Sequence, residues 1–192
     1  GMDRFYEGNW THYNADGQTL PENTGAIRPV IKDRADQLWA GTERGGLILR
    51  NGEQFTIIRD PLLSPDKNDP LAYRVTGLAA DADNNLWISN SGVENQLVMR
   101  YPDASYRKFK IPFTLNGDTV GRILLDEQNQ KWILSPGGNG LLCFNHGLTI
   151  DNTGDDQWRY YRSGVGNGNL PSNEVLSFAI DDFGFIWVGT AE

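Results

Sequence analysis

The sequence has 192 residues, a length that fits one domain with a sizeable core. Its 25 acidic and 17 basic side chains give a formal net charge of −8, which argues against a nucleic-acid partner because such partners require a basic face. No apolar run approaches the ~20 residues that span a bilayer, so we expect no membrane insertion. The single cysteine, Cys143, excludes an internal disulfide and a cysteine-cluster zinc site. The 22 glycines and many aromatic residues indicate short strands joined by tight turns.

A tryptophan-centred string recurs four times along the chain. The copies are LWAGT at 38–42, LWISN at 86–90, KWILS at 131–135 and IWVGT at 186–190, with Trp-to-Trp spacings of 48, 45 and 55 residues. Self-similarity at this period is typical of solenoids, propellers and repeat arrays. The repeat therefore decides the fold class.

The same predicted strands follow one another in each repeat. First strands at 26–31, 75–80, 120–125 and 175–180 each lead through an acidic or Asn-rich turn into the Trp string, which forms the second strand. Third strands at 46–50, 96–101 and 140–145 and fourth strands at 54–59, 106–111 and 157–162 complete the first three repeats. Four strands in 45–55 residues make one blade of a β-propeller. We predict an all-β propeller domain or propeller segment over residues 1–192, with four four-stranded blades centred on Trp39, Trp87, Trp132 and Trp187.

The two ends of the chain each supply half of the last predicted blade. The fourth Trp string is followed by only a few residues, whereas segments 2–7 and 10–13 are typical of a third and a fourth strand. The N-terminal strands therefore complete the fourth blade, either within one chain or in a second copy, which would give an eight-bladed ring from a homodimer. Long loops such as 60–74 would crowd a four-bladed centre, which favours the ring of two chains.

Few residues suggest catalysis or metal binding. The only histidines, His12 and His146, lack a nucleophile motif nearby. Segment 81–85 resembles the first half of an EF-hand loop, but Leu86 stands where Gly is needed and Gly92 where a bidentate Glu is needed. We therefore predict no enzymatic activity, no catalytic residue, no metal and no cofactor, and we interpret Cys143 as a small buried hydrophobe.

Binding is the chemistry that the loops favour. The loops that join fourth to first strands (14–25, 60–74, 112–119 and 163–174) and second to third strands (42–45, 89–95 and 135–139) gather on one face of a propeller. Their amide, guanidinium, carboxylate and phenol groups suit hydroxyl-rich or carboxylate-bearing ligands through bidentate hydrogen bonds and ring stacking. The predicted ligand-binding residues are Arg44, Tyr73, Arg74, Asn90, Glu94 and Asn139.

The repeats resemble those of a known family. LPSNEV at 170–175 followed by DDFGFIWVGT at 181–190 is similar to the two-component regulator propeller repeat, and the first copy matches it at 38–42 and 45–47. The second and third copies depart from the family pattern, because Ser89-Asn90 and Leu134-Ser135 stand where Gly-Thr is expected.

The resemblance implies a function outside the cytoplasm. Repeats of this family usually build periplasmic sensor propellers of hybrid histidine kinases that respond to oligosaccharides. The segments 138–142, 155–158 and 166–173 are also similar to a surface component of the type IX secretion system. The expected roles are thus a ligand-sensing module for an oligosaccharide or lipopolysaccharide-like ligand, or an interaction scaffold of a secretion assembly. Either role implies a location in the periplasm or at the cell surface.

Overall fold

The computed structural model describes residues 1–14 and 20–191. Residues 15–19, within the predicted loop 14–25, and residue 192 lie outside the described part. The strands are β1 (Met2–Tyr6), β2 (Asn9–Tyr13), β3 (Ile27–Lys32), β4 (Leu38–Thr42), β5 (Leu47–Asn51), β6 (Gln54–Ile58), β7 (Arg74–Ala80), β8 (Leu86–Ser91), β9 (Leu97–Arg100), β10 (Tyr106–Phe109), β11 (Ile123–Leu125), β12 (Lys131–Ser135), β13 (Gly140–Asn145), β14 (Gln157–Tyr161), β15 (Val175–Ile180) and β16 (Ile186–Thr190). Two 3₁₀ turns, η1 (Asn116–Asp118) and η2 (Thr153–Asp155), are the helical segments among the described residues, and none of these is long enough to cross a membrane.

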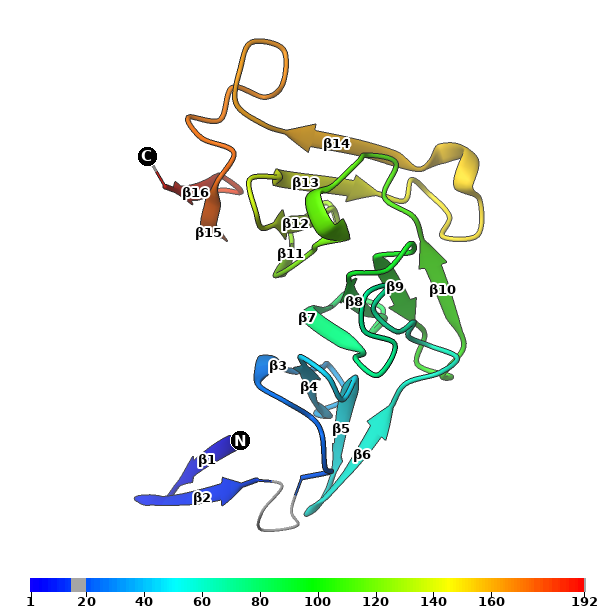
Figure 1. Ribbon diagram of the computed structural model, residues 1–192, viewed down its shortest axis with the longest axis vertical. Helices are drawn as coiled ribbons and strands as arrows, with labels where there is room; N and C mark the ends of the chain where they lie inside the picture. The colour runs from blue at the N-terminus through cyan, green and yellow to red at the C-terminus, as the bar shows by residue number, and fades with distance from the viewer. Residues whose placement is uncertain (15–19, 192) are drawn as a thin grey trace.

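Three complete antiparallel blades form the body of the structure. Each blade pairs its four strands in sequence order: β3-β4-β5-β6, β7-β8-β9-β10 and β11-β12-β13-β14. The blades follow one another along a C-shaped arc, with first strands toward the concave side and fourth strands toward the convex side (Figure 1). The all-β propeller prediction is confirmed.

The strands predicted to share a fourth blade form two separate two-stranded sheets. Strands β1 and β2 form one two-stranded sheet and β15 and β16 another. They lie at opposite ends of the arc (Figure 1). This structure therefore does not show the arrangement in which the N-terminal strands complete the fourth blade within one chain.

A hydrogen-bonded turn joins the first and second strands of every repeat. In the first repeat the Asp33 Oδ1 atom accepts the backbone N–H groups of Ala35 and Gln37, each at 2.9 Å, and Oδ2 accepts the Trp39 indole N–H at 2.8 Å. Asp36 adopts the left-handed conformation, with φ of 63°. The same indole–carboxylate bond recurs between Trp87 and Asp81, Trp132 and Asp126, and Trp187 and Asp181, at 2.9, 2.9 and 2.7 Å. We call this unit the Asp–Trp clamp.

In the first two repeats the clamp orients a large ring into the space between blades. Trp87 is 0% exposed and Trp39 is 1% exposed. Trp87 joins a cluster with Phe109 and Phe144 between the second and third blades, and Trp39 joins one between the first and second blades. An aspartate bound to the indole N–H also satisfies the one polar group of the buried ring.

Small residues allow the blades to approach closely. A Cβ atom on Gly77 of β7 would lie 2.0 Å from the carbonyl oxygen of Gly121 in the next blade. The Ser89 hydroxyl donates to that same oxygen at 2.7 Å. Ser89 takes the position of Gly41, where an added Cβ atom would instead lie 2.5 Å from Val75. The second repeat thus has Ser89 where the family pattern has glycine, and Ser89 lies beside two glycines, Gly77 on the neighbouring strand and Gly121 in the next blade.

We expect the substitution Trp87→Ala to lower the free energy of unfolding by about 3–5 kcal/mol, from lost burial and the cavity left behind. Phe183→Ala is the control, because Phe183 is 86% exposed, and it should change stability by less than about 0.5 kcal/mol. Urea denaturation of both variants measures the difference. Equal stability of the two variants would contradict a structural role for the buried indole.

Candidate functional site

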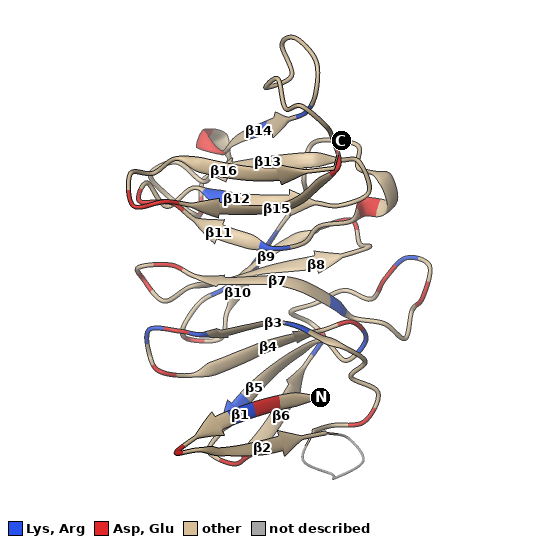
Figure 2. Cartoon of the chain, turned by 90° about the vertical axis from the view of Figure 1, so that its left-hand side faces the viewer, with Lys and Arg blue, Asp and Glu red and all other residues tan. Residues whose placement is uncertain are grey.

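A cavity of about 630 Å³ opens among the first three blades, on the face that carries the long loops. These loops lie at the ends of the strands opposite the acidic Asp–Trp turns (Figure 2). The polar residues that line the cavity are Arg28, Glu43, Asp66, Asn68, Arg74, Thr76, Ser91 and Thr119. They come from the first strands and from the two groups of loops that the sequence indicated.

Asp66 organises the loop at the base of this cavity. Its Oδ1 atom accepts the backbone N–H of Asn68 at 2.7 Å, and its Oδ2 atom accepts the Nε–H of Arg74 at 2.7 Å. Asp66 is almost fully buried, whereas the Arg74 side chain is 36% exposed, so the ion pair joins a buried carboxylate to a guanidinium that water can reach. Since a guanidinium has five N–H donors, this pair fixes the Arg74 side chain while leaving it able to donate further.

Gly92 makes this arrangement possible. Its φ is +81°, and a Cβ atom there would lie 2.2 Å from the Asp66 carboxylate. The Gly92 carbonyl accepts the backbone N–H of Lys67 at 2.9 Å. A side chain at position 92 would displace the carboxylate that holds Arg74.

A second arginine stands on another wall of the cavity. Arg28, on β3, donates its Nε–H to Glu43 at 2.7 Å and forms a further ion-pair contact with it through Nη2. The Thr76 hydroxyl donates to the carbonyl of Val120 at 2.5 Å, which ties the second blade to the third beside the cavity. The cavity therefore combines two carboxylate-oriented guanidinium groups with amide and hydroxyl groups.

The structure places one predicted ligand-binding residue, Arg74, in the wall of this cavity. Arg44 forms an ion pair with Asp69 at 2.7 Å, and this contact lowers the pKa of Asp69. The Tyr73 hydroxyl donates a hydrogen bond to Asp60, and the bond raises the pKa of the phenol. These side chains lie on the loops next to the cavity.

Glu94 lies further along the loop face. It accepts a hydrogen bond from Lys110 at 2.7 Å, which lowers the pKa of Glu94. Both side chains are exposed, so the pair is open to solvent and to ligands.

The two predicted asparagines are buried and hold the loops together. Asn90 accepts the backbone N–H of Ser64 at 2.7 Å, and Asn139 accepts that of Asn116 at 2.8 Å. Asn139 also donates to the carbonyl of Pro136 at 2.7 Å. These contacts give both residues a positioning role beneath the loop surface.

Sequence reasoning missed the other polar residues of the cavity wall, which are Arg28, Glu43, Asp66, Asn68, Thr76, Ser91 and Thr119. Arg28 lies inside a predicted first strand, where a propeller interior was expected rather than a site. Asp66 and Asn68 stand in a predicted loop, and the pattern Asp-x-Asn is typical of a side chain that accepts the backbone N–H two residues on. That signal was available, but it predicts a turn and not the partner Arg74.

The two histidines and the cysteine make their contacts outside the cavity. His12 contacts Asp3 at 2.5 Å on the N-terminal hairpin, and His146 stacks on Trp87 at 5.9 Å. Burial raises the pKa of the Cys143 thiol to about 12, and its Sγ donates to Gln130. The described residues contain no group of three or more metal-ligating side chains. Asp81 uses both carboxylate oxygens in its clamp turn, including a bond from Asn85 at 2.9 Å.

A family model matches the end of the chain. The two-component regulator propeller model covers residues 169–192, which include the fourth Trp string. The resemblance to that family is confirmed. No curated protein matches the sequence.

Solved structures of propeller-bearing proteins are similar over almost the whole chain. PorZ, an essential bacterial surface component of the type IX secretion system of Porphyromonas gingivalis, superposes with a TM-score of 0.75 and 22% identity, over 96% of this chain and 27% of PorZ. The extracellular domain of BT4673, a putative one-component system from B. thetaiotaomicron, gives 0.69 and 20% identity, over 95% and 22% of the two chains. The H270A virginiamycin B lyase from Staphylococcus aureus gives 0.66 and 12% identity, over 95% and 53%.

These likenesses show a shared fold. The chain spans about a quarter of the length of PorZ and of the BT4673 domain, and about half of the lyase. Two of the three similar proteins are surface or extracellular components and one is an enzyme, so this fold accommodates both kinds of function.

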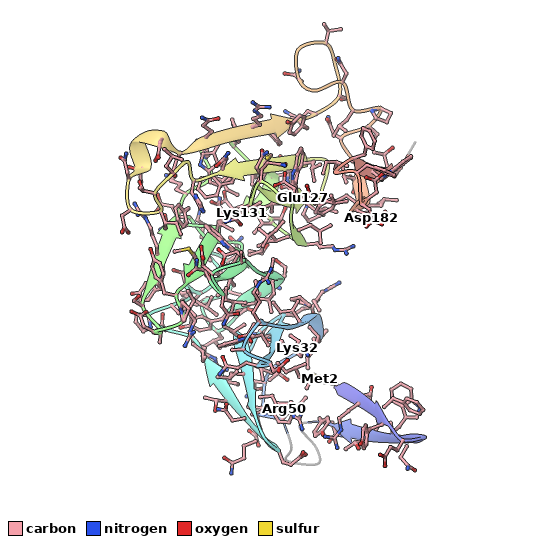
Figure 3. The ribbon with its side chains drawn as sticks, turned by 180° about the vertical axis from the view of Figure 1, so that it is seen from behind. Met2, Lys32, Arg50, Glu127, Lys131 and Asp182 are labelled. Carbon is pink, nitrogen blue, oxygen red and sulfur yellow. The ribbon has the colours of Figure 1, made fainter. Side chains whose placement is uncertain are left out.

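Lys131, on β12, is a basic side chain that is fully buried. It replaces the apolar residue that the other repeats carry, and its Nζ lies 4.2 Å from the Trp87 ring centroid. Its Nζ–H donates to the carbonyl of Asn129 at 2.7 Å. Burial lowers the pKa of Lys131 from 10.5 to about 8. The side chain points into the interior (Figure 3).

We expect Lys131 to make stability depend on pH. Between pH 8 and 10.5 the unfolded chain keeps a proton that the folded chain has lost, so unfolding becomes harder as pH rises, by up to about 1.4 kcal/mol per pH unit. Lys131→Met removes this dependence while keeping an apolar stem. Denaturation of both proteins at pH 7.5, 8.5 and 9.5 measures it. A difference between the two proteins that is constant over this range would contradict a depressed pKa.

Proposed function

We propose that this chain is a non-enzymatic recognition module of an extracytoplasmic sensor system, and that it binds a hydroxyl-rich, oligosaccharide-type ligand at the loop-face cavity. The observation that carries the proposal is the pair of carboxylate-oriented arginines, Arg28 and Arg74, in a cavity of about 630 Å³. Guanidinium groups fixed in this way suit hydroxyl or carboxylate oxygens, as in a sugar with an acidic substituent. Such a ligand includes the sugar part of a lipopolysaccharide.

The surroundings of the cavity support the proposal. Asn68, Thr119 and Ser91 add amide and hydroxyl groups in its wall, and on the neighbouring loop the Arg59 guanidinium lies over the Tyr73 ring, 5.6 Å from its centroid. Arg44 and Glu94 extend the polar surface on the same face. Sites of 300–1,000 Å³ with a few fixed polar groups are typical of small-molecule recognition.

Two observations support the absence of catalysis and a location outside the cytoplasm. Neither His146, which stacks on Trp87, nor the buried Cys143 lines the cavity. The similar extracellular domain of BT4673 and the surface component PorZ place related folds outside the cytoplasm.

The second candidate function is an interaction scaffold of a secretion assembly. It is favoured by the superposition on PorZ, at a TM-score of 0.75 over 96% of this chain. In that role the loop face contacts a protein partner and the cavity needs no ligand.

A binding screen separates the two functions. Calorimetry with neutral oligosaccharides, uronate-bearing oligosaccharides and lipopolysaccharide is expected to give binding with at least one class. Arg28→Ala should weaken this binding tenfold or more, because it removes a guanidinium that Glu43 orients in the cavity wall, and Asn68→Ala should weaken it as well, because it removes an amide from that wall. Arg159→Ala is the matched control, since this exposed arginine lies on the outer strand β14, and it should bind like the unaltered chain.

The proposal fails if no ligand class binds, which would favour the scaffold function. Equal loss of affinity in Arg159→Ala would also contradict it, since binding would then depend on overall charge. Thermal melts of all variants confirm that the comparison is made on folded protein.

A further inference from the structure

The basic side chains in and around the loop-face cavity are matched by carboxylates. In the cavity wall Arg28 forms an ion pair with Glu43, and Arg74 forms one with Asp66 at 2.7 Å. Three further ion pairs on the surrounding loops, at 2.7, 2.6 and 2.7 Å, are Arg44–Asp69, Lys67–Asp118 and Lys110–Glu94. These five pairs together add no net charge to the face.

The two pairs in the cavity wall leave hydrogen-bonding atoms free for a ligand. Asp66 binds Arg74 through Nε, and the two Nη atoms of Arg74 have no hydrogen-bond partner among the described residues. Glu43 accepts both N–H groups of Arg28 with Oε1, so its Oε2 atom has no partner among these residues either. Both sides of the wall can be reached, since the Glu43 side chain is 33% exposed and that of Arg74 is 36% exposed. Arg74 thus offers donors and Glu43 offers an acceptor.

This combination distinguishes between uncharged and acidic ligands. A hydroxyl group both donates and accepts hydrogen bonds, so it can bind to a guanidinium and to a carboxylate in the same wall. An ionised acidic group only accepts, and beside Glu43 it would meet a like charge, which disfavours binding. The formal net charge of −8 of the chain repels an anion at longer range as well.

We propose that the ligand of this cavity is uncharged as well as hydroxyl-rich, and that Glu43 is the residue that excludes acidic sugars. The inference rests on the proposed function and narrows its ligand to neutral oligosaccharides. Arg28 and Arg74 then bind hydroxyl oxygens, whereas Glu43 both orients Arg28 and accepts a ligand hydroxyl with Oε2.

Acidic and neutral forms of the same sugar chain test this preference. Oligomers of galacturonate and of mannuronate carry one carboxylate on each sugar, and methyl esterification removes the charge while it keeps the hydroxyl groups. Calorimetry at pH 7 is expected to show that the unaltered chain binds at least one methyl ester about tenfold or more tightly than the corresponding acid. Raising the NaCl concentration from about 50 to about 500 mM should change the affinity for the ester less than about twofold, because no charged ligand group is bound.

The substitution Glu43→Gln tests the role of the carboxylate. Glutamine keeps an oxygen that can accept from Arg28 but removes the negative charge, so the acid is expected to bind about tenfold more tightly than it binds to the unaltered chain. The affinity for the ester should change less than about threefold. Glu53→Gln is the matched control, because Glu53 pairs with Arg50 at 2.9 Å beyond the end of β5 that lies away from the loop face. It removes the same charge and should leave the ratio of the two affinities unchanged.

Each outcome decides for or against the inference. A preference for the ester that is lost in Glu43→Gln alone supports it. An acid that binds as tightly as its ester overturns it and leaves the proposed function standing. A preference that survives in Glu43→Gln, or that is lost equally in Glu53→Gln, overturns the role of Glu43. If no acid, ester or neutral oligosaccharide binds, the proposed function fails and the inference fails with it.

Discussion

The hydrogen bond between an aspartate and a tryptophan indole six residues later is the interaction on which the rest of this structure depends. In each of the four repeats one carboxylate closes the turn between the first two strands and fixes the ring of the second. One oxygen accepts two backbone N–H groups and the other accepts the indole N–H. Local turn geometry and packing between blades are thus set by the same side chain.

The position of the ring has consequences for the opposite face of the arc. Adjacent blades approach closely through small residues such as Gly77 and Gly121. The loops at the other ends of these strands are then brought together across three blades. This is how Arg28 of β3 and Arg74 of β7, distant in sequence, come to line one cavity. Asp66 binds the Arg74 guanidinium, and Glu43 binds that of Arg28.

Much of the fold was predictable because the repeat has a strong signal. The Trp strings and their spacing predicted four four-stranded blades, and the structure forms three of them, with β1–β2 and β15–β16 as separate two-stranded sheets. The clamp bond itself was missed, although the constant interval from Asp33 to Trp39 and from Asp81 to Trp87 is visible in the sequence. The site was harder, since loops carry polar residues whether or not they bind. Asn90 and Asn139 were predicted as ligand contacts, but they lie below the surface, because an amide can satisfy several buried backbone groups at once. Arg28 was missed because its cavity forms only when blades far apart in sequence meet.

Hydrogen exchange of the indole N–H protons tests the central claim most directly. NMR spectra of nitrogen-15-labelled protein resolve the indole signals, and Trp10, which is 62% exposed, serves as the internal reference. We predict that the Trp39 and Trp87 indole protons exchange far more slowly than that of Trp10, and that Asp81→Ala accelerates exchange at Trp87 while leaving Trp39 protected. Exchange at Trp87 as fast as at Trp10 in the unaltered chain would contradict the role given to the Asp–Trp clamp.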